Sequence, residues 1–152
     1  MNNRGRYYEE FSAGQQYATD RRTITEVDHI NFSTAFGFFE PLFMDRAYVV
    51  KETPYSRPIV PGALTFSTAE GLTILSGILH GTGLAFLGVE LKVIRPVFIG
   101  ETIRVEIEVV EKRQTTKPDR GIVSFRQRVN NQDDARVMEY TIRRMIRRKP
   151  HR

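Results

Sequence analysis

The hydrophobic period of the chain changes near its middle. From Leu84 onward, apolar residues alternate with polar ones over 85–93, 103–109, 123–129 and 136–143. A period of two is typical of strands that have one face in water. The connections between these segments are short and rich in turn-forming residues, which favours antiparallel neighbours over crossovers. The second half of the chain therefore predicts four antiparallel strands.

Before this change the period is helical. Residues 63–80 carry apolar side chains at helical spacing and few charges, and they follow the rigid segment Pro58–Gly62. We expect one long helix here, covered on most sides and ending at His80. In that position the cation of His80 would suit the helix dipole.

Shorter elements are expected near the N-terminus. Thr25, with an acidic residue three positions later, is typical of a helix N-cap, and Gly37 is typical of a helix stop. A second short helix is predicted over 45–52, with Asp45 as its N-cap. Residues 15–23 predict a short polar strand.

This order of elements predicts an α+β fold in which an antiparallel sheet wraps around the long helix. At 152 residues the chain is expected to form one domain over 1–152. No apolar run reaches the length of a membrane span, so a cytoplasmic protein without a membrane partner is expected.

Composition excludes several kinds of chemistry. The chain has no cysteine and three histidines, which excludes thiolate sites and argues against a metal site rich in histidine. Six of its 23 basic residues lie in a basic tail over 143–152, and the preceding 142 residues hold 17 basic and 18 acidic groups. The tail is open to three interpretations: a solvated end, a clamp for an anion such as CoA phosphate or an acidic partner, and a nucleic-acid contact. Because it lacks stacking aromatics, no nucleic-acid partner is expected.

Several local motifs appear in one order along the chain. They are Phe11-x-x-Gly14, Thr25-x-x-Asp28, Pro58-Ile59-Val60-Pro61-Gly62 and Arg95-Pro96-Val97-Phe98-Ile99-Gly100-Glu101. Together they resemble the MaoC-like dehydratases of the hot-dog fold from Phe11 to about Arg144. The resemblance implies an antiparallel sheet wrapped around a long central helix and, by activity, a hydro-lyase of fatty acid metabolism related to (R)-specific enoyl-CoA hydratases.

The catalytic segment of those hydratases is similar to G-D-x-N-P-L-H-x-D, whereas residues 37–45 here read GFFEPLFMD. The resemblance places Phe38 at the catalytic aspartate and Phe43 at the catalytic histidine. Phenylalanine has no titratable proton, and each lost acid–base group costs about 10² to 10⁴ in rate. We therefore expect the usual hydration of enoyl-CoA to be lost and leave open whether the protein is an enzyme.

The scaffold would still hold an acyl thioester. By resemblance, the backbone N–H of Gly62 polarises the thioester carbonyl. The expected substrate-binding residues are Phe38, Glu40, Phe43, Gly62 and Arg95, with no metal and no cofactor beyond the CoA of the substrate. Glu40 also fits a solvated turn residue. The aromatic-rich residues Phe36, Phe38, Phe39, Phe43 and Met44 fit either core packing or the wall of an acyl pocket.

A second hypothesis concerns Glu70, which lies eight residues after Gly62. This spacing is similar to that of hot-dog acyl-CoA thioesterases, whose helix carboxylate acts as nucleophile or base. The alternatives are that Glu70 pairs with an arginine or faces a partner subunit.

His29 is expected to be a surface or interface residue. The expected partners are acyl-CoA and a second copy in a homodimer, or a dyad-bearing paralogue in a heterodimer.

Overall fold

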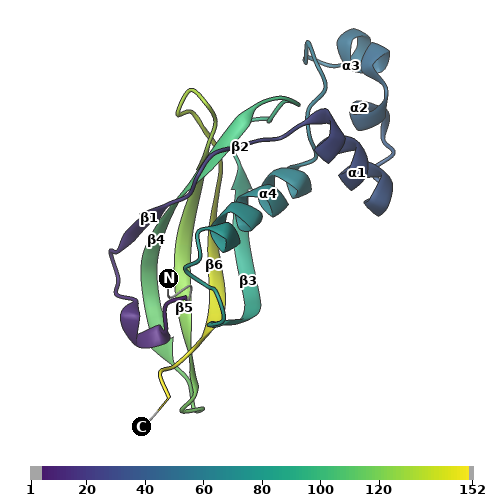
Figure 1. Ribbon diagram of the computed structural model, residues 1–152. Coiled ribbons are helices and arrows are strands. Elements are labelled where there is room, and N and C mark those ends of the chain that lie inside the picture. The colour runs from purple at the N-terminus through teal and green to yellow at the C-terminus, as the bar shows by residue number, and fades with distance from the viewer. Residues whose placement is uncertain (1–4, 151–152) are drawn as a thin grey trace.

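The computed structural model describes residues 5–150. An antiparallel sheet with strand order β1-β4-β5-β6-β3 curves around helix α4, and β2 pairs with the beginning of β4 (Figure 1). The expected α+β layout is confirmed. The elements are η1 (Tyr8–Glu10), β1 (Gln16–Ala18), β2 (Arg22–Thr23), α1 (Glu26–Phe36), α2 (Pro41–Met44), α3 (Arg46–Glu52), α4 (Gly62–Leu75), β3 (Gly83–Val93), β4 (Thr102–Gln114), β5 (Arg120–Asn130) and β6 (Arg136–Arg147).

The four strands predicted from the alternating pattern are confirmed, although all four run further than expected. Alternate residues of β4, from Ile103 to Val109, are buried in the core, and so are Val123 and Phe125 of β5. Their polar neighbours point to the outer face, where Arg128 pairs with Glu108 on the adjacent strand at 3.1 Å. The alternation therefore assigns one face to the core and the other to cross-strand ion pairs.

The long helix ends five residues earlier than predicted. Helix α4 stops at Leu75, and Gly77 adopts a positive φ of 83° that leads the chain into turns. Ile78 is nevertheless buried, so its apolar character reflects packing of a turn rather than a continued helix. His80 consequently does not lie at a helix end, and the expected capping role for it is wrong.

The expectation that this helix is covered on most sides is also wrong for the single chain. Ala63, Ser67 and Gly71 are exposed along one side of α4, and Ile74 and Leu75 are exposed near its end. Small and apolar residues, rather than charges, therefore occupy the side of α4 that faces away from the sheet.

Helices α1, α2 and α3 form a helical arm (residues 26–52) that projects from the sheet beside the N-terminus of α4 (Figure 1). The capping box of Thr25 and Asp28 is confirmed, and Gly37 ends α1 with φ of 78°. Asp45 caps α3 as expected by accepting from the Tyr48 amide at 2.9 Å. Helix α2 was not predicted, and the polar strand expected over 15–23 is divided into β1 and β2.

Candidate functional site

The N-terminus of α4 borders a cavity of about 300 Å³. Gly62 begins the helix, so its N–H has no intrahelical acceptor and lies at the positive end of the helix dipole. The loop before it is fixed to the loop between β3 and β4 because the Val60 N–H donates to the Val97 carbonyl at 2.8 Å. The cavity is lined by Phe43, Tyr55, Ile59, Val60, Gly62, Thr65, Val93, Ile94, Arg95, Pro96, Val97, Val137 and Met138.

Three of the five residues predicted to bind substrate line this cavity, namely Phe43, Gly62 and Arg95. Phe38 instead packs against Phe43, with ring centroids 6.1 Å apart, and Glu40 is exposed at the start of α2. Among the described residues, the lining contains no aspartate, glutamate or histidine. These residues can therefore bind a ligand and polarise a carbonyl, but they offer no carboxylate or imidazole for acid–base chemistry.

Two residues of the aromatic-rich segment fit the two interpretations, a cavity wall and internal packing, and the other three fit neither. Phe43 forms part of the cavity wall, whereas Phe38 packs within the arm. Phe36, Phe39 and Met44 are exposed on the arm surface. Within the described chain, only Phe43 of these five is both at the cavity and in the segment that the resemblance singles out.

Glu70 belongs to a cluster of polar side chains between α4 and the sheet. Its carboxylate accepts from the Tyr140 hydroxyl at 2.7 Å and from the Arg144 guanidinium at 2.8 Å. Gln127 accepts from Arg144 at 2.9 Å and donates to Tyr140 at 2.8 Å. The side chains of Glu70 and Arg144 are only 16% and 8% exposed. This geometry is the arginine pairing that was the alternative to a catalytic Glu70.

His29 is 1% exposed in the arm, so the expected surface position is wrong within this chain. Its Nε2 lies 2.8 Å from the Phe43 carbonyl oxygen, which joins α1 to α2. Its Nδ1 and the Ser33 hydroxyl are both buried without a partner among the described residues. His29 lines a separate hollow beside Glu26 and Asp45, and it does not line the cavity at Gly62.

The first half of the basic tail expected over 143–152 belongs to the sheet, since β6 continues to Arg147. Alternation along the strand turns Arg144 toward Glu70 and leaves Arg143 and Arg147 exposed. Arg148 pairs with Glu9 at 2.7 Å. Although burial alone would raise the pKa of Glu9, hydrogen bonds from Arg148 and the Lys149 amide lower it overall. Residues 151 and 152 lie outside the described residues.

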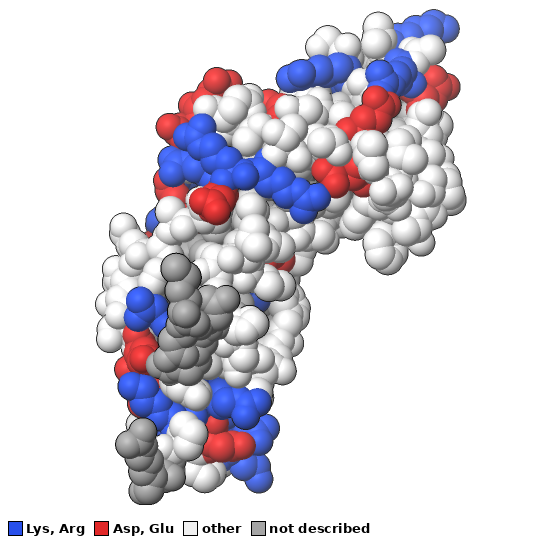
Figure 2. All heavy atoms as spheres, in the orientation of Figure 1, with Lys and Arg blue, Asp and Glu red and all other residues white. Residues whose placement is uncertain are grey.

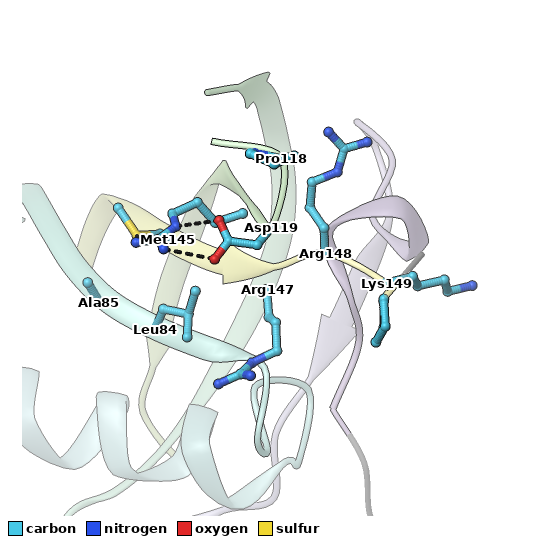
Figure 3. Close-up of a pocket in the computed structure, with 10 residues that line it drawn as sticks. Leu84, Ala85, Pro118, Asp119, Met145, Arg147, Arg148 and Lys149 are labelled. Atoms are coloured by element: carbon cyan, nitrogen blue, oxygen red, sulfur yellow. Dashed lines mark hydrogen bonds and ion pairs between the residues drawn. The ribbon is translucent and has the colours of Figure 1, made fainter. Parts of the chain in front are cut away.

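A larger cavity, of about 660 Å³, lies at this opposite end of the sheet (Figure 3). Asp119 on its wall is neutralised by a paired hydrogen bond to Arg120, with both N···O distances 2.8 Å. Leu84, Ala85 and Met145 supply apolar surface, and none of the motif residues lies there. Because chemistry rather than size distinguishes a site, the smaller cavity at Gly62 is the candidate functional site.

Two further classes of site are absent from the described residues, 5–150. They contain no group of three or more histidine, aspartate or glutamate side chains placed to hold a metal ion. None of the helices among them is long and apolar enough to cross a membrane.

A curved antiparallel sheet around one helix, with a cavity at the helix N-terminus, is the hot-dog fold. The chain superposes with a TM-score of 0.86, over 97% of its length, on 46% of a Mycobacterium tuberculosis protein described as a double hot-dog fold, at 21% identity. This likeness concerns the fold alone.

The family is shown by sequence. The model of the MaoC like domain matches residues 10–131, and the chain belongs to this family. It is 34% identical over 117 residues to protein MaoC of Klebsiella aerogenes, covering 76% of this chain and 33% of that protein. It is 36% identical over 97 residues to the (R)-specific enoyl-CoA hydratase of Aeromonas caviae, covering 64% and 67%. The chain thus spans about a third of MaoC and two thirds of the hydratase.

A solved structure supports the same assignment. The monoamine oxidase regulatory protein of Archaeoglobus fulgidus superposes with a TM-score of 0.88 at 32% identity, over 97% of both chains. The protein is therefore a MaoC-like hot-dog protein of the dehydratase family and is related to (R)-hydratases.

Several residues that line the cavity were not predicted to bind substrate. Tyr55 lies in the loop between α3 and α4, Val97 in the loop between β3 and β4, and Met138 near the beginning of β6, so no local spacing brings them together. The sequence does contain a signal for Arg144, because the adjacent pair Arg143-Arg144 breaks the alternation of β6. That break indicates a charge directed into the core, although it does not identify Glu70 as the partner.

Proposed function

We propose that this protein binds an acyl thioester, an acyl-CoA, at the Gly62 cavity and lacks the usual hydratase activity of its relatives. The observation that carries the proposal is the lining itself, which joins a helix-terminal N–H and apolar walls but includes no carboxylate or imidazole. A thioester carbonyl that accepts from Gly62 would place its acyl group against Phe43 and Met138. Arg95, at the same cavity, is suited to the negative charge of CoA phosphates.

The arrangement separates two parts of the family's chemistry. Polarisation of the carbonyl needs only a fixed donor, and Gly62 retains one. Activation of water needs a base within hydrogen-bond reach, and the aromatic side chains of Phe38 and Phe43 supply none. CoA would be bound as part of the ligand, and no separate cofactor is required.

The direct test is to titrate the purified protein with crotonyl-CoA and to follow loss of the enoyl absorbance. We expect saturable binding with little or no hydration. Hydration at a rate normal for the family would show that another group replaces the dyad, and absence of binding would remove the proposal.

A matched pair of variants tests the donor. Gly62→Pro removes the N–H at the first position of a helix, where proline is well tolerated. Gly62→Ala keeps the N–H, and its added Cβ would lie 3.7 Å from Val93, an ordinary contact. A donor that polarises the carbonyl should shift the absorbance of bound crotonyl-CoA to longer wavelength. We expect Gly62→Pro to weaken binding about fivefold and to abolish this shift, and Gly62→Ala to behave like wild type. Equal behaviour of the two variants would remove Gly62 from the site.

We also propose that a second hot-dog chain pairs along β3. This edge strand exposes Leu84, Phe86, Leu87, Leu91 and Val93, and the exposed side of α4 lies in the same chain without a cover. A homodimer is the first candidate, and a heterodimer with a dyad-bearing paralogue is the second. Light scattering on the purified chain separates them, because a stable monomer that dimerises only with a paralogue supports the second.

Thioester hydrolysis by Glu70 is the remaining hypothesis. It requires the ion pair with Arg144 to open and the carboxylate to reach a ligand held at Gly62. Comparison of acyl-CoA hydrolysis in wild type and Glu70→Gln tests it. We expect no difference, because the carboxylate is already bound by two donors.

A further inference from the structure

The Gly62 cavity ends a short way along the two elements that form its inner wall. Helix α4 and strand β6 both run from the cavity toward the far end of the sheet (Figure 1). The lining includes Thr65 of α4 and Met138 of β6, but it does not include the neighbouring Phe66 of α4 or Tyr140, the next residue on the inward face of β6. At about 300 Å³ the space is at the small end of ligand sites.

Tyr140 blocks the direction in which a longer ligand would extend. It lies two residues beyond Met138 on the same face of β6, about 7 Å further along the strand. Its ring meets Phe66 edge-on, with centroids 5.0 Å apart, and its side chain is 1% exposed. The two rings therefore join α4 to β6 directly beyond the cavity.

The polar cluster holds the Tyr140 ring in place. Burial, and next the nearby Glu70 carboxylate, raises the pKa of the Tyr140 hydroxyl well above its usual value, so the group stays protonated and donates to Glu70. Gln127 donates both to Tyr140 and to Thr73, each at 2.8 Å. Moving the ring would leave several buried polar groups without partners, which is costly.

We infer that Phe66 and Tyr140 form a fixed floor of the cavity, and that this floor restricts the ligand to a short acyl chain. The inference rests on the proposed binding of acyl-CoA at this cavity. Glu70 acquires a role that needs no catalysis, because it is a positioning residue for the floor. Arg144 in turn neutralises Glu70 and joins it to Gln127.

The experiment measures the affinity of the full chain for butyryl-, octanoyl- and dodecanoyl-CoA. Wild type should bind butyryl-CoA most tightly. Phe66→Ala opens the floor on the side of α4 and should raise the affinity for octanoyl-CoA at least about tenfold relative to butyryl-CoA, because each newly buried methylene adds to binding. Tyr17→Ala is the matched control, since this partly buried aromatic residue on β1 lies at the opposite edge of the sheet and outside the cavity lining.

Tyr140→Phe tests the positioning by Glu70. It keeps the ring and removes the hydroxyl that anchors it, so we expect butyryl-CoA affinity to change little while discrimination against octanoyl-CoA falls. Circular dichroism of each variant checks folding. If Phe66→Ala does not fold, Phe66→Leu should raise the affinity for octanoyl-CoA relative to butyryl-CoA in the same way but by a smaller factor.

The outcomes separate the two proposals. Failure of wild type to bind any of the three ligands overturns acyl-CoA binding itself. Binding of all three with equal affinity overturns the floor and leaves acyl-CoA binding intact. Unchanged selectivity in a folded Phe66 variant also overturns the floor.

Discussion

The body of the molecule, which is the sheet with α4, differs from the helical arm in where it places polar and apolar side chains. The body buries polar side chains, whereas the arm exposes aromatic ones. In the body, the polar groups of Glu70, Gln127 and Tyr140 are enclosed and bonded to one another. In the arm, Phe36 and Phe39 are 70% and 62% exposed. Figure 2 shows the same contrast at the surface: charged side chains gather over parts of the body and near α3, while the side of the arm at α1 is largely uncharged.

The difference indicates which part of the fold is complete in one chain. The body supplies partners for the Glu70 carboxylate and for the side chains of Gln127 and Tyr140, so its stability should depend on these internal contacts. Exposed aromatic residues on the arm contribute little to a single chain, and their burial would need a second chain. Because the arm supplies Phe43 to the cavity, the site lies at the junction of the self-contained part and the incomplete part.

The largest effect is expected from breaking the polar cluster of the body. Arg144→Met leaves the buried Glu70 carboxylate without its cation, and we expect the free energy of unfolding to fall by about 3 kcal/mol. Urea unfolding of the purified protein measures this change. The double variant Glu70→Leu/Arg144→Met removes both charges and should recover most of the loss. A double variant as unstable as the single one would mean that the cluster acts mainly through packing.

Two neighbouring valines in α3 test the arm. Val49 is 0% exposed and Val50 is 62% exposed. Val49→Ala should cost roughly 2 kcal/mol because it leaves a void, and it should speed proteolysis within residues 26–52. Val50→Ala should change stability by less than about 0.5 kcal/mol in dilute monomer. A cost for Val50→Ala that appears only as protein concentration rises would show that a second chain covers this face.

The same contrast explains how far the sequence predicts the structure. Local sequence signals predicted the structure correctly where a segment determines its own conformation, as in the Thr25 cap, the Gly37 stop and the alternation of β4. They failed where contacts with distant segments determine the conformation. The apolar residues Ile78 and Leu79 continued the helical pattern, but Gly77 turned them into a loop that packs on the core.

The candidate site was predictable to the same degree. Gly62, Phe43 and Arg95 follow from motifs and meet at one cavity. Phe38 and Glu40 belong to the same motif, yet the turn of the chain before α2 directs them elsewhere. The identity of the residue facing Glu70 depends on how α4 packs against β6, which a single sequence does not specify.

A smaller effect than that of Val49→Ala is expected at the start of the arm, where Thr25 and Asp28 cap α1. Thr25→Ala removes the acceptor of the Asp28 amide and should cost about 1 kcal/mol in the free energy of unfolding.

The Thr25 backbone amide is the main cause that lowers the pKa of Asp28 below its ordinary value of 3.8, with the Thr25 hydroxyl and Arg22 adding to it. A carboxyl with a lowered pKa in the folded state stabilises that state above its unfolded pKa, and this contribution disappears as the pH falls through the folded value. The stability difference between wild type and Asp28→Asn should therefore be constant above about pH 5 and shrink below about pH 4. Hydrogen exchange of the α1 amides measures this locally, and a difference that stayed constant into acid would show that the Asp28 charge does not support the cap.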